Sequence, residues 1–142
     1  MPTEFQALAD VIEESYEFTL SYAAQGHASD AGTPQGRQLR QLLARSAEAM
    51  RGLAAAGGAA VESEALAPAA PYEQFFRILA RDAEDAATVV ELVLAQPAIG
   101  SQLIDNMNAS IHLRALLTDI FLVAEILESH QSRSTASQHE VL

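Results

Sequence analysis

The residues that could bind a metal ion or transfer a proton are 19 Asp and Glu and four His. A carboxylate-bridged two-metal site in a helical bundle needs a Glu three residues before a His on each of two helices, so that both side chains point inward. The positions three before each His hold Ala24, Ala109, Leu127 and Ala136. Because this motif is absent, we expect no metal site and no cofactor.

Other catalytic groups are missing as well. The chain has no Cys, which excludes disulfides, Cys-based zinc sites and thiolate catalysis. All eight basic residues are Arg, so neither a Schiff-base lysine nor a P-loop lysine is present. No Ser lies in a Gly-x-Ser-x-Gly setting. We therefore predict that the protein is not an enzyme.

Two single residues, His112 and Asp82, remain candidates for a catalytic role. His112 has Arg114 close by, as phosphoaccepting histidines in bundles do, but a bulky residue follows it directly. A histidine at the edge of a helix face is the favoured interpretation. Asp82 falls among apolar positions on the helical wheel, and a buried carboxylate there needs a partner such as Arg114. A structural ion pair or an exposed edge position is favoured over a catalytic acid.

The charge balance restricts the partners. The formal net charge is −11 and the isoelectric point is near 4.6. An acidic chain is repelled by phosphate backbones and by anionic lipid, so we expect neither a nucleic-acid nor a membrane partner. A basic protein partner remains open.

The sequence also suggests a location. The first four residues include one acidic residue, Glu4, and no basic residue, whereas a signal peptide carries positive charge before its apolar run. The most apolar stretch, residues 120–127, contains Glu125 and is far shorter than the ~20 residues needed to cross a bilayer. We predict a cytoplasmic protein.

Helical periodicity dominates the chain. Ala is the strongest helix former and is abundant here, whereas aromatic residues make up only 6%. Apolar residues recur at helical spacing over residues 4–25, 34–56, 72–95 and 101–131. These segments predict an all-α protein with a single four-helix bundle domain over residues 1–131. Residues 132–142 are polar and predict a flexible C-terminal tail.

Local signals mark the helix ends. Thr3 is placed to cap the first segment, and Thr33 followed by Pro34 is placed to begin the second. Gly57-Gly58 is expected to end that second segment. The resulting connection, residues 57–71, is long for a bundle and leaves the spatial order of the helices open.

The last segment carries two apolar faces that are out of phase. Positions 103–111 centre on one side of the wheel, and positions 113–127 centre roughly 130° away. The switch predicts either five helices with a break near residue 108 or two halves that pack on different neighbours. The second face is broader than a peripheral helix needs, which predicts either a central core helix or, on that face, a homodimer or partner-binding surface. Its proposed members are Leu116, Ile120, Phe121, Val123 and Leu127.

Together these features favour a non-catalytic adaptor, assembly factor or regulatory subunit that acts by protein–protein interaction. An acidic inhibitor or immunity protein that covers a basic partner is an alternative. A bundle that binds an apolar small molecule near Phe75, Phe76 and Phe121 is another.

Overall fold

The computed structural model describes the backbone of residues 3–141 and the side chains of residues 3–133. These residues form helices and connecting turns, with no strand among them. The helices are α1 (Glu4–Ala24), α2 (Pro34–Ser63), α3 (Ala69–Leu94), α4 (Ser101–Ala109) and α5 (Ile111–Val141). The all-α prediction and the break near residue 108 are confirmed.

Capping residues set the starts of α1 and α2, as the sequence predicts. The Thr3 hydroxyl accepts a hydrogen bond from the backbone N–H of Gln6, whose side chain accepts one from the Thr3 N–H in return. Thr33 accepts from the backbone N–H of Gly36. Pro34 lies in the first turn, where a missing N–H leaves no intrahelical bond unmade.

Helix α2 passes through Gly57-Gly58, and the prediction that it ends there is wrong. The flanking alanines offset the two glycines in helix propensity and carry the helix to Ser63. Gly57 also allows close packing, because a Cβ there would lie 2.5 Å from the ring of Phe76 on α3. The connection between α2 and α3 is therefore short, residues 64–68, and makes the two helices antiparallel neighbours.

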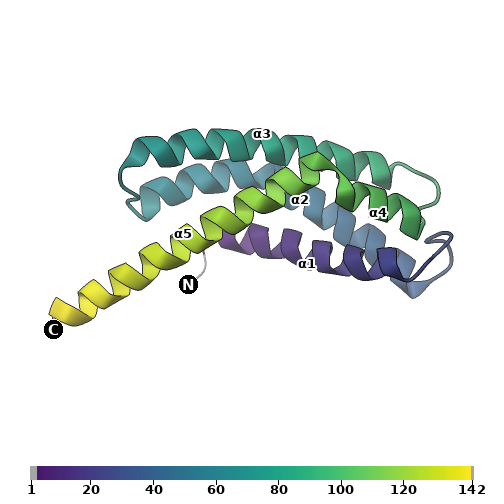
Figure 1. Cartoon of the computed structure of the whole chain (residues 1–142), viewed down its shortest axis with the longest axis horizontal. Coiled ribbons are helices and arrows are strands. Elements are labelled where there is room, and N and C mark those ends of the chain that lie inside the picture. Colours follow the sequence, from purple (N-terminus) through teal and green to yellow (C-terminus); the bar gives the residue numbers. More distant parts are fainter. Residues whose placement is uncertain (1–2, 142) are drawn as a thin grey trace.

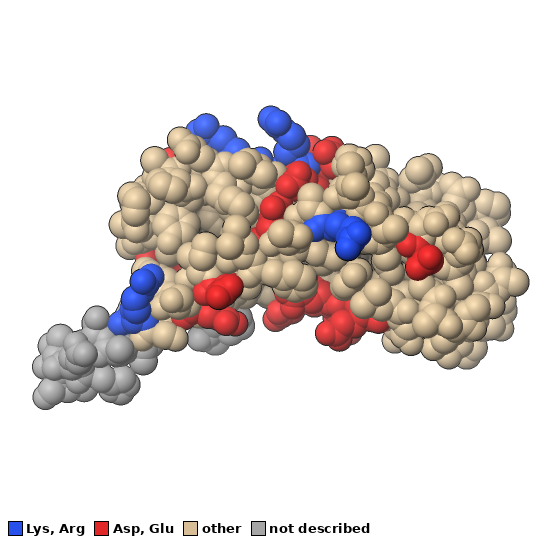
Figure 2. Space-filling view, in the orientation of Figure 1, with Lys and Arg blue, Asp and Glu red and all other residues tan. Residues whose placement is uncertain are grey.

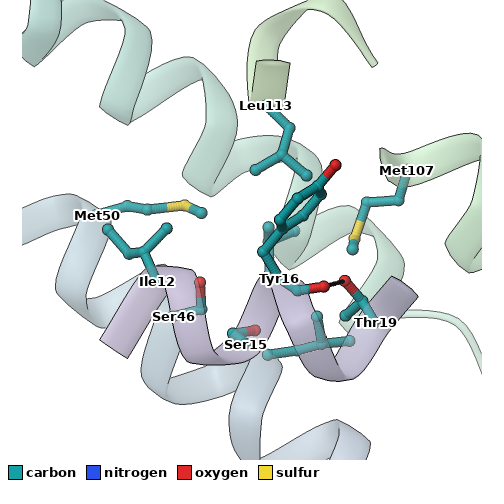
Figure 3. Close-up of a pocket in the computed structure, with 10 residues that line it drawn as sticks. Ile12, Ser15, Tyr16, Thr19, Ser46, Met50, Met107 and Leu113 are labelled. Carbon is teal, nitrogen blue, oxygen red and sulfur yellow. Dashed lines mark hydrogen bonds between the residues drawn. The ribbon is translucent and has the colours of Figure 1, made fainter. Parts of the chain in front are cut away.

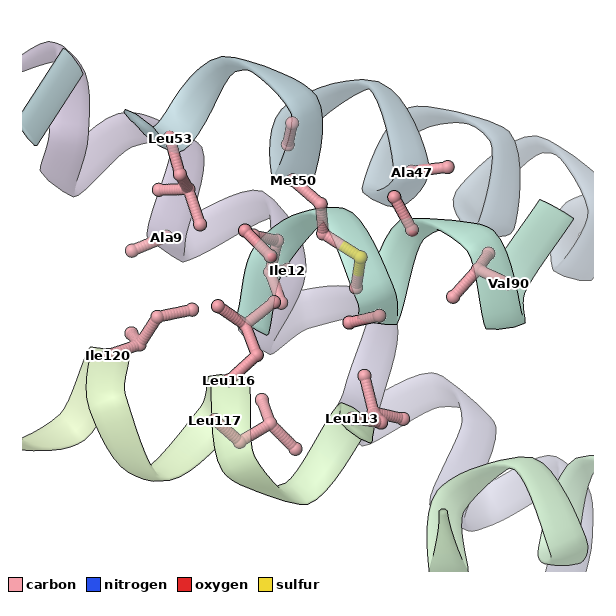
Figure 4. Close-up of a cluster of buried hydrophobic side chains, with 14 of the residues drawn as sticks. Ala9, Ile12, Ala47, Met50, Leu53, Val90, Leu113, Leu116, Leu117 and Ile120 are labelled. Carbon is pink, nitrogen blue, oxygen red and sulfur yellow. The ribbon is translucent and has the colours of Figure 1, made fainter. Parts of the chain in front are cut away.

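The helices pack around one apolar core. Figure 1 shows α2 and α3 side by side, α1 along α2, and α4 turning back beside α1. Helix α5 crosses this body diagonally and packs chiefly on α3. In Figure 4, Leu116 and Ile120 of α5 point toward Ala9 and Ile12 of α1. Both flanks of the inner face of α5 are thereby enclosed by the same chain.

The break at Ser110 explains the change of phase in the last apolar stretch. Ser110 has ψ of 132°, which takes the chain out of helical geometry for one residue. Before it, Ile104 and Met107 are buried on α4, which packs mainly on α1. After it, α5 packs mainly on α3. The two halves therefore face different neighbours.

Helix α5 also extends beyond its expected end near Gln131. It remains helical to Val141, and the flexibility predicted for residues 132–142 stays a prediction. Near this point the helix is held to the α2–α3 connection. The His130 ring lies 3.1 Å from the carbonyl oxygen of Glu64, and the Gln131 side chain donates to the Glu64 carboxylate over 3.1 Å.

Candidate interaction surface

The surface predicted on the last helix is mostly core. Leu116, Ile120 and Leu127 have no exposed area, and Val123 is also buried. Phe121 alone of the five is exposed, to 52%. As an exposed surface, the predicted set is therefore wrong in four of its five members.

The breadth of the apolar arc has a structural cause. Because α5 lies diagonally across the body, α3 covers one side of its inner face and α1 the other. A helix that contacts two neighbours buries a wider arc than a helix at the edge of a bundle. The broad arc therefore indicates a central position for α5 and requires no second subunit.

A different set of apolar side chains on α5 is exposed. Leu122 is 48% exposed and Ile126 is 36% exposed, one turn apart on the flank that faces α3. With α3 they form an apolar groove of about 340 Å³, which we call the α3–α5 groove. Its walls are Pro68, Pro71, Tyr72, Phe75, Leu122, Val123 and Ile126.

The wall from α3 comes from the start of that helix. Pro68 is the N-cap residue and Pro71 lies in the first turn, where proline costs no intrahelical hydrogen bond. Both proline rings are exposed. Tyr72 and Phe75 follow at helical spacing and are half-buried against the core. This end of α3 thus presents a rigid apolar edge to α5.

The three phenylalanines predicted to lie near a small-molecule site do not line one groove. Phe75 lines the α3–α5 groove, whereas Phe76 is buried and packs edge-on against Phe5 with ring centroids 5.7 Å apart. Phe121 lies on the other flank of α5 from Leu122 and Ile126, since successive residues of a helix are 100° apart. Only one of the three phenylalanines therefore lines the groove.

Two carboxyl groups lie close to the groove, Asp82 on α3 and Asp119 on α5. Burial, the hydrogen bond with Asp82 and the charge of Asp82 raise the pKa of Asp119 to about 7. Ionised carboxylates only accept hydrogen bonds, so a bond between these two requires a proton on one of them. Oδ2 of Asp119 is buried and has no hydrogen-bond partner among the described residues. Burial and the neighbouring Asp82 therefore both favour the neutral form of the Asp119 carboxyl.

The predicted partner of Asp82 is wrong. The ion pairs among the described side chains are Arg40–Asp30 and Arg51–Glu91, and Arg114 takes part in neither. Arg114 and Asp119 are five residues apart and so point to different sides of α5. Since Asp119 is the residue that meets Asp82, Arg114 lies on the wrong flank.

A second charged feature is the outer face of α1. Figure 2 shows acidic side chains gathered along the lower edge of the body, over α1. Burial raises the pKa of Glu13, and the charges of Asp10, Glu17 and Glu128 raise it further. These like charges repel one another, which makes the face attractive to a basic partner.

At the end of the body away from the α3–α5 groove, a polar cluster holds the α1–α2 and α3–α4 loops in place. Asp30, which is buried, accepts hydrogen bonds from the side chain of Arg40 and from the backbone N–H of Ile99. Arg40 also donates to the carbonyl oxygens of Leu94 and Gln96, over 3.1 and 3.0 Å. These carbonyls close the C-terminal end of α3, where an Arg side chain is a favourable partner.

Tyr22 and Ser101 complete this cluster. The Tyr22 hydroxyl donates to the carbonyl oxygen of Ile99 over 2.7 Å, and the Ser101 hydroxyl donates to the carbonyl oxygen of Tyr22 over 2.6 Å. His27 stacks on the Tyr22 ring with centroids 4.5 Å apart. Most of these bonds end on backbone atoms, so the cluster is occupied with holding loops together. Helical periodicity and local motifs in the sequence gave no sign of it.

A small cavity lies beside the helix break and is lined by side chains from all five helices (Figure 3). Its volume is about 10 Å³, which is room for one water molecule at most. The Thr19 hydroxyl lies 3.2 Å from Oδ1 of the nearby Asn108, whose buried Nδ2 has no partner among the described residues. This cavity is too small to be a ligand site.

Comparison with other proteins adds no assignment. No protein-family model, curated protein or solved structure matches this chain. Within the described residues, no three acidic or histidine side chains come together as metal ligands. None of the described helices combines the length and the apolar character needed to cross a membrane. The surfaces described above are therefore the basis for inferring function.

Proposed function

We propose that this protein is a non-catalytic adaptor or regulatory subunit that binds another protein through the α3–α5 groove. The observation that carries the proposal is the exposure of Leu122 and Ile126 beside the apolar start of α3. The chain encloses the rest of the inner face of α5 but leaves this strip in water. Exposed contiguous apolar surface is typical of interaction sites.

The shape of the groove supports one mode of binding. Two antiparallel helices form its walls, and the apolar side chains of α5 recur one turn apart along it. Such grooves accept the apolar face of an amphipathic helix, whose own anchors recur at the same spacing. The net charge of −11 favours a partner with basic residues around those anchors.

A second candidate is a carrier of an apolar small molecule. A groove of about 340 Å³ lies within the usual range of ligand sites, and its walls are almost wholly apolar. The acidic face of α1 separately supports the inhibitor alternative, in which that face covers a basic partner. The carrier would use the same groove with a different ligand, whereas the inhibitor would use a different surface.

The test is capture of partners from the source organism with matched variants of the whole chain. A Leu122→Glu/Ile126→Glu double variant places charges in the groove. Leu92→Glu is the control, because Leu92 is 65% exposed and lies outside the groove. We expect a stoichiometric protein that binds wild type and the control and is lost with the double variant. Retention of that protein by the double variant would overturn the proposal.

The small-molecule candidate has its own measurement. Native mass spectrometry of the purified chain reports any apolar molecule that stays bound. A bound mass that the double variant loses, with no protein captured, would favour the carrier over the adaptor.

A homodimer through α5 remains part of the proposal, and it now depends on Phe121. Replacement by Glu is expected to convert a dimer to a monomer in sedimentation while the helix content stays unchanged. A wild-type chain that is monomeric at high micromolar concentration would count against the dimer. The cytoplasmic location, like the absence of nucleic-acid and membrane partners, remains a prediction from charge and sequence.

A further inference from the structure

The Asp82–Asp119 pair stands at one end of the α3–α5 groove. A step of seven residues, about 10 Å along a helix, takes Phe75 to Asp82 on α3. The same step in the opposite direction takes Ile126 to Asp119 on α5, as expected for antiparallel helices. Phe75 and Ile126 both line the groove, so the two carboxyl groups lie together about two turns further along it.

Apolar surface continues from the groove toward the pair. Ile78 lies between Phe75 and Asp82 on the same flank of α3 and is 56% exposed. Leu122 occupies the corresponding place on α5, one turn before Ile126 and three residues beyond Asp119. A segment that lies in the groove would therefore run from apolar contacts directly onto the two carboxyl groups.

No basic side chain among the described residues forms an ion pair with Asp82 or Asp119. The pKa of Asp119 responds to Asp82 and to burial, with no lowering by a basic group. The side of α5 that faces α1 carries Glu128 and lies half a turn away from Asp119, since the two are nine residues apart. The charge at this end of the groove is thus negative and unpaired among the described residues.

We propose that the occupant of the groove is an amphipathic helix with a basic residue at one end of its apolar stripe, and that this residue pairs with Asp82 and Asp119. The inference rests on the proposed function, because it specifies the partner element of the same site. Apolar anchors would cover Leu122, Ile126 and Phe75. The cation would be the group that satisfies the two carboxylates.

The chemistry of the pair favours this occupant. A carboxylate removed from water without a partner is costly, so a purely apolar helix would cover the pair at a penalty. An Arg or Lys removes that penalty and adds charge-assisted hydrogen bonds. The pair therefore selects among amphipathic helices and sets their direction in the groove.

The test uses a displayed library of helical peptides with a fixed Leu stripe at positions i, i+4 and i+7 and random residues one and two turns beyond each end. Selection is run on the whole wild-type chain. Peptides that also bind the Leu122→Glu/Ile126→Glu variant are discarded, because they bind outside the groove. We expect the surviving peptides to carry Arg or Lys beyond one end of the stripe only.

Individual peptides then measure the pairing. Changing the selected Arg to Gln is expected to weaken binding about tenfold on wild type. On the Asp82→Asn/Asp119→Asn variant, the Arg and Gln peptides are expected to bind equally, with the Gln peptide at least as tight as on wild type, because the variant has no carboxylate left to desolvate. Since the Arg-to-Gln comparison on wild type uses no protein variant, it holds even if the Asn variant folds poorly.

The outcomes separate the inference from the proposed function. Groove-dependent peptides with no basic preference at either end would overturn the pairing and leave the adaptor proposal standing. A basic preference that persists in the Asp82→Asn/Asp119→Asn variant would also overturn the pairing. If no selected peptide is sensitive to charge at Leu122 and Ile126, both the pairing and the groove as a docking site fail.

Discussion

The end of the body that holds the α1–α2 and α3–α4 loops differs sharply from the end where α3 begins. At the loop end, buried Asp30 and partly buried Arg40 bind each other and the backbone of a neighbouring loop. At the groove end, the side chains between α3 and α5 are apolar, and several are left in water. Polar groups at the loop end are used within the fold, whereas apolar groups at the groove end remain free to bind. The difference associates fold stability with the loop end and, in the function proposed above, interaction with the groove end.

Asp30→Ala is expected to have the largest effect. The change removes the partner of Arg40 and leaves the N–H of Ile99 unpaired in the core. Breaking a fully buried pair costs about 3–5 kcal/mol, and because Arg40 is one-third exposed we expect about 2–3 kcal/mol in urea unfolding at pH 7. A loss below about 1 kcal/mol would contradict a structural role for this end.

The same variant has a signature in pH. The hydrogen bond from Arg40 lowers the pKa of Asp30, so its stabilisation is present above the unfolded pKa near 4 and is lost as pH falls through the folded value. Wild type is therefore expected to lose more stability on acidification to pH 3 than the Asp30→Ala variant. Equal losses of stability in wild type and variant would mean that Asp30 does not contribute to the acid sensitivity of the fold.

At the groove end, a polar substitution is expected to stabilise. The pKa of Asp119 is raised to about 7, so the folded chain holds a proton that the unfolded chain releases near pH 4. The contribution of Asp119 to the free energy of unfolding is then fully present below about pH 4, decreases between pH 4 and 7, and stays constant above pH 7. Asp119→Asn removes this loss, and after discounting for partial exposure we expect a gain of about 1–2 kcal/mol at pH 8.

The control for that gain is Asp85→Asn, because Asp85 is exposed one turn from Asp82 on α3. Urea unfolding at pH 4, 6 and 8 should show the gain for Asp119→Asn growing with pH and no such trend for the control. A loss of stability at pH 8 would mean that the pair supports the fold and is not strained by its shared charge.

How far the sequence predicts these two ends depends on how local the determining contacts are. The caps at Thr3 and Thr33 and the phase change near residue 108 involve neighbours along one helix, and all three are confirmed. The loop end was missed because Arg40 reaches carbonyls more than 50 residues away. The end of α2 was misplaced because the packing of Gly57 on Phe76 is likewise a contact between helices.

Only the α5 side of the groove can be predicted from the sequence. Leu122 and Ile126 fall outside the apolar arc of the last helix, so helical periodicity alone marks them as exposed apolar residues. Their partners on α3 depend on the register between α3 and α5, which helical periodicity does not specify. Because periodicity does not specify this register, it led to the prediction that Asp82 pairs with Arg114, whereas in the structure Asp82 meets Asp119.

Tyr22→Phe gives a smaller test of the loop end. The variant keeps the ring but removes the hydroxyl that donates to the buried carbonyl oxygen of Ile99. A hydrogen bond of this kind contributes about 1 kcal/mol, and we expect that loss in urea unfolding. Tyr16→Phe is the matched control, because the Tyr16 hydroxyl has no hydrogen bond among the described residues and its removal should change stability little.

Leu122→Gln is expected to have the smallest effect, within about 0.5 kcal/mol of wild type in the same measurement. Half of the Leu122 side chain is already in water, so the polar replacement costs little buried area and gains hydration. A near-neutral result, beside a clear loss for Tyr22→Phe, means that the fold does not need the apolar character of the groove. A loss of about 2 kcal/mol would instead mean that Leu122 holds α5 against α3, and its exposure would then no longer argue for a docking partner.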